Sequence, residues 1–216
     1  PLTPIQLSAE RLQFKLAGKL MNGDADMLAR STQMIINQVQ AMKRMVDDFR
    51  DYARLPVPEV EPLDLNALIS EVLGLYESSA VAIETQFAGD LPKVLGDATQ
   101  LRQVIHNLLR NSEDALEGRD AAAIRIVTER AGQQARLLIA DNGPGFPLEL
   151  LPRIFEPYVT TKARGTGLGL SIVKKIVDEH QGTIEISNAP EGGARMDIRL
   201  PLVKKEEAKN GDNSGR

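Results

Sequence analysis

The chain has 216 residues, of which 42% are hydrophobic and 4% aromatic with no Trp, so one or two domains can form around cores of Leu, Ile, Val and Met. Its net charge of −4, from 26 basic and 30 acidic residues, gives no overall basic footprint for nucleic acid. The absence of cysteine excludes disulfides, thiolate chemistry and cysteine-based zinc sites.

Residues 1–55 are expected to be entirely helical. Apolar residues such as Ile5 and Leu12 recur at helical spacing in the first helix, and a turn at residues 22–24 is expected to end in Asp24 as an N-cap. A long helix from residue 25 to about 54 follows, with an apolar stripe of the kind that packs on partner helices. A four-helix bundle formed by two chains is favoured over a hairpin within one chain, because two helices alone bury little surface.

Residues 56–63 contain three prolines and are expected to be a linker between this hairpin and a second domain at residues 64–203. Asp64 is expected to cap one helix, and Asp97 with Gln100 resembles a capping box at the start of another. Helices are expected over residues 64–76, 97–116 and 171–180, and strands over 83–87, 124–129, 136–140, 183–187 and 194–200. Antiparallel strand pairs with three helices predict an α+β two-layer sandwich. The polar residues 204–216 are expected to be a disordered tail.

Two glycine clusters dominate the second domain. The first is Asp-Asn-Gly-Pro-Gly-Phe at residues 141–146, and the second is Gly-Thr-Gly-Leu-Gly-Leu at residues 165–170. Glycine allows the backbone to approach a phosphate closely and to adopt positive φ. The second cluster leads into a helix, whose N-terminal N–H groups suit an anion. Two such loops therefore predict one shared anionic ligand.

Asn107 and Asn111 lie four residues apart on one face of the helix at residues 97–116, and Asp114 lies close to them. A solvated polar face is one interpretation of this pattern. A magnesium role is the other, because Mg²⁺ prefers oxygen ligands and shares its sites with substrate phosphates. The neighbouring glycine loops favour the magnesium interpretation.

Asp141 follows a buried-looking strand and can accept a hydrogen bond from the exocyclic amine of adenine. The alternative for Asp141 is an ordinary turn-capping aspartate before Asn-Gly. Lys162 and Arg164 flank the second cluster and can meet phosphates, or they belong to an ordinary charged loop. Phe155 and Tyr158 are expected to anchor a lid.

These motifs, in this order, resemble the catalytic part of a bacterial sensor histidine kinase. Residues 107–111 match the family's N box, 141–145 its first glycine box, 155–162 its F box and 165–169 its second glycine box. Gly192-Gly193 matches a last glycine turn, so the resemblance covers about residues 1–201. Residues 1–5 and 157–162 further resemble the NtrY type of nitrogen-regulation kinase.

The resemblance implies an ATP-binding domain of the gyrase/Hsp90/histidine-kinase type, with ATP and Mg²⁺ as cofactors. It implies transfer of the γ-phosphoryl group to a histidine and then to an aspartate of a response-regulator receiver domain, of the NtrX type if the narrower match holds. The metal ligand of the family matches the second asparagine, Asn111. The ATP-binding residues implied are Asn107, Asn111, Asp114, Asp141, Gly143, Gly145, Tyr158, Thr161, Lys162, Arg164, Gly165, Thr166, Gly167, Leu168, Gly169 and Leu170.

In this family the phosphoacceptor histidine lies directly before a Pro-Leu-Thr-Pro segment such as residues 1–4, so we expect it upstream of Pro1. His106 and His180 are expected to be structural. We therefore expect a cytoplasmic fragment that forms a homodimer through residues 1–54 and binds nucleotide without phosphorylating itself. The longer parent protein is expected to be anchored in the bacterial inner membrane. The anchor would lie outside this chain, which has no apolar run of the ~18–20 residues that span a bilayer.

Two other classes remain as alternatives. One is an ATP hydrolase of the same nucleotide-binding fold, in which a Glu activates water at the position of Asn107. An amide cannot act as a general base, so Asn107 favours transfer over hydrolysis. The other is a non-catalytic module for dimerisation or nucleotide sensing, against which the complete glycine boxes argue.

Overall fold

The computed structural model describes residues 2–20, 22–53, 55–162 and 165–203. The chain divides into two compact units, one comprising Pro1–Pro56 with Phe155–Ser171 and the other Val57–Ile154 with Ile172–Arg216. Arg164 and the expected tail at residues 204–216 lie outside the described residues. The domain boundaries expected from the sequence stay a prediction.

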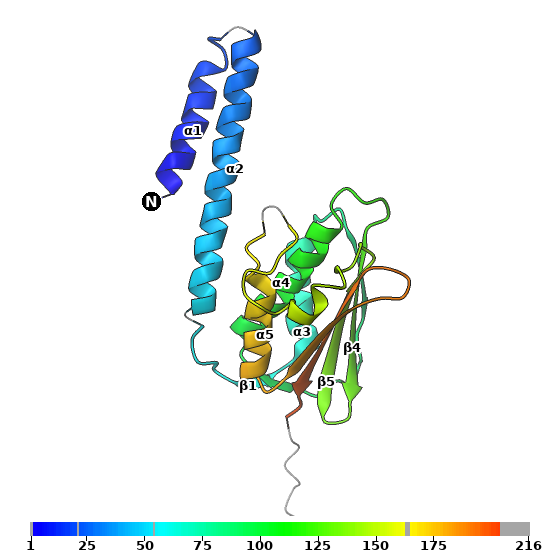
Figure 1. Cartoon of the computed structure of the whole chain (residues 1–216). Helices are drawn as coiled ribbons and strands as arrows, with labels where there is room; N and C mark the ends of the chain where they lie inside the picture. Colours follow the sequence, from blue (N-terminus) through cyan, green and yellow to red (C-terminus); the bar gives the residue numbers. More distant parts are fainter. Residues whose placement is uncertain (1, 21, 54, 163–164, 204–216) are drawn as a thin grey trace, which may run out of the picture. The chain divides into compact units, whose positions relative to one another are not determined.

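The first unit contains two helices, α1 (Thr3–Leu16) and α2 (Asn22–Ala53), which lie side by side (Figure 1). Ala9 of α1 and Ile36 and Val39 of α2 are buried. The expectation of a turn at residues 22–24 capped by Asp24 is wrong, because α2 already begins at Asn22. Asp24 lies in the first helical turn, where a carboxylate is stabilised by the positive end of the helix dipole.

The second unit is built on a five-stranded sheet with the order β2-β4-β5-β7-β6. Its strands are β2 (Ala82–Gln86), β4 (Ala123–Ala131), β5 (Gln134–Asp141), β6 (Thr183–Asn188) and β7 (Ala194–Pro201). The pairs β4–β5, β5–β7 and β6–β7 are antiparallel as expected, whereas β2 and β4 are parallel. The long connection between β2 and β4, which contains a helix, permits this parallel pairing.

The layer on one face of the sheet contains α3 (Leu65–Leu73), α4 (Ala98–Ala115) and α5 (Gly169–Glu179), of which α5 belongs to this unit from Ile172 onward (Figure 1). The helical turn η1 (Gly74–Tyr76) follows α3, and η2 (Leu151–Arg153) precedes α5. In β5 every second residue is buried, including Leu137 and Ile139. This alternation marks the helix-facing side and places the core between sheet and helices.

A short two-stranded sheet pairs β1 (Glu61–Leu63) with β3 (Val94–Gly96) in antiparallel register. The last three residues of the expected linker therefore form a strand. Strands of three residues are too short to show the alternating pattern by which a strand is recognised in sequence.

The helix starts were predicted well where a side chain caps them. Asp64 accepts a hydrogen bond from Ala67 N–H at the start of α3, and Asp97 accepts from Thr99 and Gln100 N–H at the start of α4. By contrast, α5 begins at Gly169, two residues before the expected start. Among the helices of the described residues, none combines the length and the apolar character that crossing a bilayer requires.

Candidate functional site

Asp141, at the end of β5, is held by three hydrogen bonds and is 7% exposed. Its Oδ1 accepts from the backbone N–H groups of Gly143 at 2.9 Å and Ala194 at 3.1 Å. Its Oδ2 accepts from the Ser112 hydroxyl of α4 at 3.1 Å. The bond to Gly143 is the turn-capping bond of the alternative interpretation, while the other two tie Asp141 to β7 and α4.

The rest of the first glycine cluster is fixed by two asparagines. Asn142 accepts from Ala123 N–H at 2.9 Å and donates to the Ala121 carbonyl at 2.8 Å. Asn188, the last residue of β6, accepts from Phe146 N–H and donates to the Phe146 carbonyl, both at 2.7 Å. These bonds secure the loop at both ends.

The glycines of this region meet specific spatial demands. Gly145 has φ +74°, and a Cβ there would lie 2.6 Å from Asn188 Oδ1. Gly193 has φ +96°, and a Cβ there would overlap the Asp141 carbonyl oxygen. A Cβ at Gly143 would lie 2.9 Å from Asp141 Oδ1. The backbone thus closes around Asp141 as only glycine allows.

Helix α4 presents Asn107 and Asn111 on its half-exposed face, and Asp114 is exposed. The opposite face is buried and includes Ser112, the residue after Asn111 and the one that bonds to Asp141. Ser112 was not expected as a site residue from the sequence. The sequence feature that could have indicated it is a polar residue placed among the apolar positions of the buried helix face.

The second glycine cluster belongs to the first unit, and its segment has its own local order. Tyr158 N–H donates to the Gly167 carbonyl at 3.0 Å, and both residues have positive φ. A Cβ at Gly167 would lie 2.5 Å from the Tyr158 carbonyl carbon. The start of α5 follows directly, and Ser171 Oγ donates to the Leu168 carbonyl at 2.8 Å. Gly167 therefore permits a close backbone crossing.

The other expected contacts in this segment are placed as follows. Thr161 is exposed and Lys162 half-exposed, while Gly165 N–H donates to the Lys162 carbonyl at 3.1 Å. Leu168 is fully buried. The other residues of the second glycine cluster are half-exposed, namely Gly165, Thr166, Gly167, Gly169 and Leu170. Gly169 and Leu170 are also the first two residues of α5.

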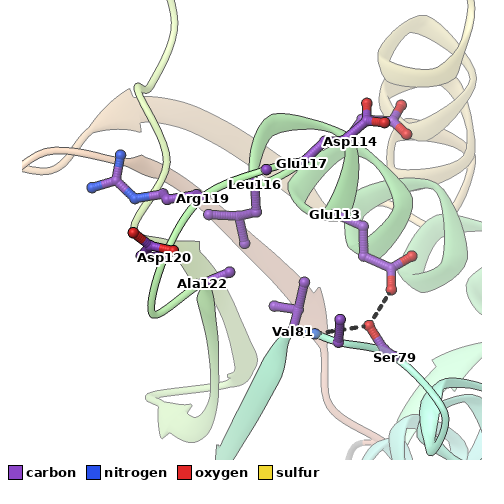
Figure 2. A pocket seen from close by; sticks show the side chains of 11 residues that line it. Ser79, Val81, Glu113, Asp114, Leu116, Glu117, Arg119, Asp120 and Ala122 are labelled. Atoms are coloured by element: carbon purple, nitrogen blue, oxygen red, sulfur yellow. Dashed lines mark hydrogen bonds between the residues drawn. The ribbon is translucent and has the colours of Figure 1, made fainter.

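A pocket lies at the C-terminal end of α4 (Figure 2). It is lined by Ser79, Ala80, Val81, Glu113, Asp114, Leu116, Glu117, Gly118, Arg119, Asp120 and Ala122. Figure 2 shows Ser79 bonded to Glu113, at 2.6 Å. Asp114 lines this pocket, whereas Asn107, Asn111 and Asp141 do not. Among the expected site residues, Asp114 is therefore the one that lines this pocket.

The two histidines differ in their surroundings. His106 is exposed, and its Nδ1 pairs with the Tyr76 hydroxyl at 2.8 Å. Burial and the nearby Glu113 carboxylate raise the pKa of Tyr76 to about 12, against an opposing effect of Arg110. His180 is 3% exposed and bonds through both ring nitrogens. A buried imidazole that forms a hydrogen bond through each ring nitrogen fits the structural role expected for His180.

The side-chain amides of Asn107 and Asn111 on α4 supply oxygen ligands, which Mg²⁺ prefers. Across the described residues, no three His, Cys, Asp or Glu side chains gather where they could hold a metal ion. An ion at α4 would therefore take most of its ligands from substrate phosphates and water, as Mg²⁺ commonly does.

Comparison with known proteins places these features in context. The model of the family described as "Histidine kinase-, DNA gyrase B-, and HSP90-like ATPase" matches residues 96–204. The nitrogen regulation protein NtrY of Azorhizobium caulinodans is 40% identical over 210 residues, covering 94% of this chain and 27% of NtrY. The chain thus spans only about a quarter of that relative. The match confirms the resemblance to sensor histidine kinases of the NtrY type.

Two solved structures support the fold. The histidine kinase ThkA in complex with the response regulator protein TrrA superposes with a TM-score of 0.71 at 26% identity, covering 94% of this chain and 59% of that chain. Full-length ShkA in complex with AMPPNP gives a TM-score of 0.71 at 23% identity, covering 95% of this chain and 44% of that chain. The expected gyrase/Hsp90/histidine-kinase nucleotide-binding fold is confirmed, whereas the dimeric four-helix bundle stays a prediction.

Proposed function

Because the chain belongs to the histidine kinase-, DNA gyrase B- and HSP90-like ATPase family, we propose that it binds ATP and supplies the γ-phosphoryl group for phosphorylation of a histidine. In this proposal Asp141 accepts the exocyclic amine of adenine, and the first glycine cluster lets the backbone approach the phosphates closely. The full-length ShkA structure holds AMPPNP, an ATP analogue, which supports the choice of ligand.

The observation that carries the proposal is the carboxylate of Asp141. Two of its bonds use Oδ1, and one, from Ser112, uses Oδ2. An ionised carboxylate offers about four acceptor positions, so Oδ2 keeps capacity for one more donor. A buried acceptor held rigidly by three bonds suits recognition of an amine, because its orientation need not be organised on binding.

Mg²⁺ belongs to the proposal through Asn111, whose amide oxygen would be its protein ligand on α4. A bound Mg²⁺ would neutralise charge on the phosphates during transfer. Asn107, on the same face, lacks the basicity to activate water, which favours transfer over hydrolysis. The phosphoacceptor is not His180, because that ring is buried and both of its nitrogens are bonded.

The proposed partners are a second copy of the chain and a receiver domain. ThkA was solved with its response regulator TrrA, which supports a receiver-domain partner, of the NtrX type if the NtrY resemblance extends to regulators. A homodimer through residues 1–54 is supported by apolar side chains that are exposed on α2 at helical spacing. These side chains are Met27, Met34, Ile35, Met42, Met45, Val46 and Phe49. A membrane anchor for the parent protein is proposed on the resemblance alone.

Calorimetric titration with ADP and Mg²⁺ tests nucleotide binding. In Asp141→Asn the Oδ1 acceptor is kept, and the Ser112 hydroxyl can rotate to accept from the new amide, so the fold should persist. The adenine amine then meets a donor in place of an acceptor, and loss of a hydrogen bond to a charged group costs about 1.5–3 kcal/mol, or roughly tenfold or more in affinity. Asp120→Asn, an equal change of charge at an exposed carboxylate, is the control. Equal ADP affinity in both variants would contradict the assignment.

The transfer reaction needs a separate test. A chain that includes a phosphoacceptor helix, given γ-labelled ATP and Mg²⁺, should acquire label that is lost in acid and kept in base, as phosphohistidine is. Asn111→Ala should abolish that labelling while leaving the fold intact. Release of free phosphate without labelled protein would favour the hydrolase.

A further inference from the structure

His180, directly after α5, is hydrogen-bonded to α5 and to the N-cap residue of α4. Its Nδ1 lies 2.8 Å from the Ile176 carbonyl of α5, and its Nε2 lies 2.9 Å from the backbone nitrogen of Asp97. A carbonyl only accepts and a backbone N–H only donates, so Nδ1 carries the proton and Nε2 is the acceptor. The contacts therefore specify one neutral tautomer.

Asp97 is the N-cap of α4 and is held from several directions. Its Oδ1 accepts from Thr99 N–H at 2.8 Å and Gln100 N–H at 3.1 Å, and its Oδ2 accepts from Glu59 N–H at 3.0 Å. In a capping box the side chain of the fourth residue would accept the N-cap N–H. Here His180, 83 residues further along the chain, takes that place instead of Gln100.

The space around the ring is matched to this contact. Gly96 precedes Asp97, and a Cβ at Gly96 would meet Leu101 Cδ1 and would lie 3.3 Å from His180 Cδ2. The ring therefore rests against bare backbone at the end of β3. With 3% of its surface exposed, His180 forms both bonds away from bulk solvent.

Helix α4 is thus bonded near both ends. At its start, the Asp97 N–H is bonded to His180, and near its end Ser112 is bonded to Asp141. Asn107 and Asn111 lie between these two points. A helix fixed at two points keeps its side chains in one place relative to the strand ends, which is what a preorganised site requires.

We propose that His180 is a positioning residue of the nucleotide site, fixing the first turn of α4 through the Asp97 N–H so that Asn107 and Asn111 stay in register with Asp141. This inference rests on the proposed nucleotide binding. The competing explanation is that His180 only fills space in the core, in which case its loss would act through stability alone.

Two substitutions separate the explanations. In His180→Gln the longer side chain places an amide oxygen near the former Nε2 and can still accept from Asp97. In His180→Asn the shorter side chain can keep the Ile176 carbonyl but cannot reach Asp97. Ile198→Val and Ile198→Ala, in the core strand β7, give a graded series of stability losses for comparison.

Amide exchange of residues 97–101 and calorimetric ADP affinity are measured on all variants. Losing one hydrogen bond that orders the helix start should raise the Kd about 2–12-fold in His180→Asn and expose these amides, while His180→Gln stays within about twofold of the parent. Equal affinities in His180→Asn and His180→Gln would overturn the proposal. So would an equal loss of affinity in an Ile198 variant of matched stability.

One further measurement needs no substitution. The ¹⁵N shifts of the His180 ring in the unsubstituted chain should show a protonated Nδ1 and a bare Nε2, and the opposite tautomer would overturn the proposal even if His180→Asn fails to fold. Absence of ADP binding by the unsubstituted chain would refute the proposed function. The exchange of residues 97–101 would then still decide whether His180 fixes α4.

Discussion

Gly193 should be far less tolerant of a methyl group than its neighbour Gly192. The two have nearly equal φ values of +96° and +98°. At Gly193 a Cβ would overlap the Asp141 carbonyl oxygen and lie 2.8 Å from its carbon and 3.1 Å from Asn142 Cα. At Gly192 the nearest atom would be the Gly143 carbonyl oxygen, at 4.0 Å. A methyl group would therefore be crowded at Gly193 and not at Gly192, while the two positions have nearly the same strained φ.

The expected magnitudes follow from this difference. Alanine at positive φ costs about 1–2 kcal/mol at either position. Overpacking against a fixed backbone adds about 1–3 kcal/mol, and this applies to Gly193→Ala alone. For a chain of this length 1 kcal/mol shifts the melting temperature by about 2–4 °C, so Gly193→Ala should melt roughly 2–12 °C below Gly192→Ala.

Thermal unfolding of both variants measures the difference, and ADP titration measures its effect on the site. The colliding atoms belong to Asp141, so Gly193→Ala should also weaken ADP binding, whereas Gly192→Ala should bind nearly as the parent does. Equal melting temperatures for the two variants would refute the argument that the Gly193 backbone packs against Asp141.

Two further predictions concern the second unit. Gln181, exposed in the turn after α5, has φ +56°, so Gln181→Gly should relieve about 1–2 kcal/mol of strain against about 0.5–1 kcal/mol of added chain entropy. A melting temperature below that of the parent would contradict this prediction. The pKa of Tyr76 is raised from 10.0 to about 12, so the folded state holds this proton longer than the unfolded chain does. The stability that protonated Tyr76 gives the folded state should be intact below pH 10 and lost as the pH rises from 10 to 12. The difference in unfolding free energy between the parent and Tyr76→Phe should therefore be constant below pH 10 and change between pH 10 and 12.

The parts of the fold that could be predicted from sequence are those with local signals. Asp64 and Asp97 begin their helices because a carboxylate at an N-cap satisfies N–H groups two or three residues away. The strands that alternate between buried and exposed residues were also found. The parallel pairing of β2 with β4 was missed, because strand partners are set by how the whole chain packs.

The site divides in the same way. Asp141 and its glycines could be proposed as site residues from the sequence because their spacing is local and their residue types are unusual. Ser112, Asn188 and the role of His180 could not, because each acts on a residue 29 to 83 positions away. Asn188 is an ordinary polar residue at the end of a strand until Phe146 is known to lie beside it.

Asp141 also shows why the two interpretations of its sequence context do not exclude each other. Its bond to Gly143 is the turn-capping bond that any Asp before Asn-Gly can form. Its bonds to Ala194 and Ser112 come from distant segments and would not be needed for a turn. A carboxylate that only capped a turn could lie in solvent, where water would meet its remaining acceptor positions. Asp141 is instead buried, so every acceptor position without a protein donor carries a cost of desolvation. A ligand that donates to Oδ2 removes that cost, which makes the buried position itself an argument for amine recognition.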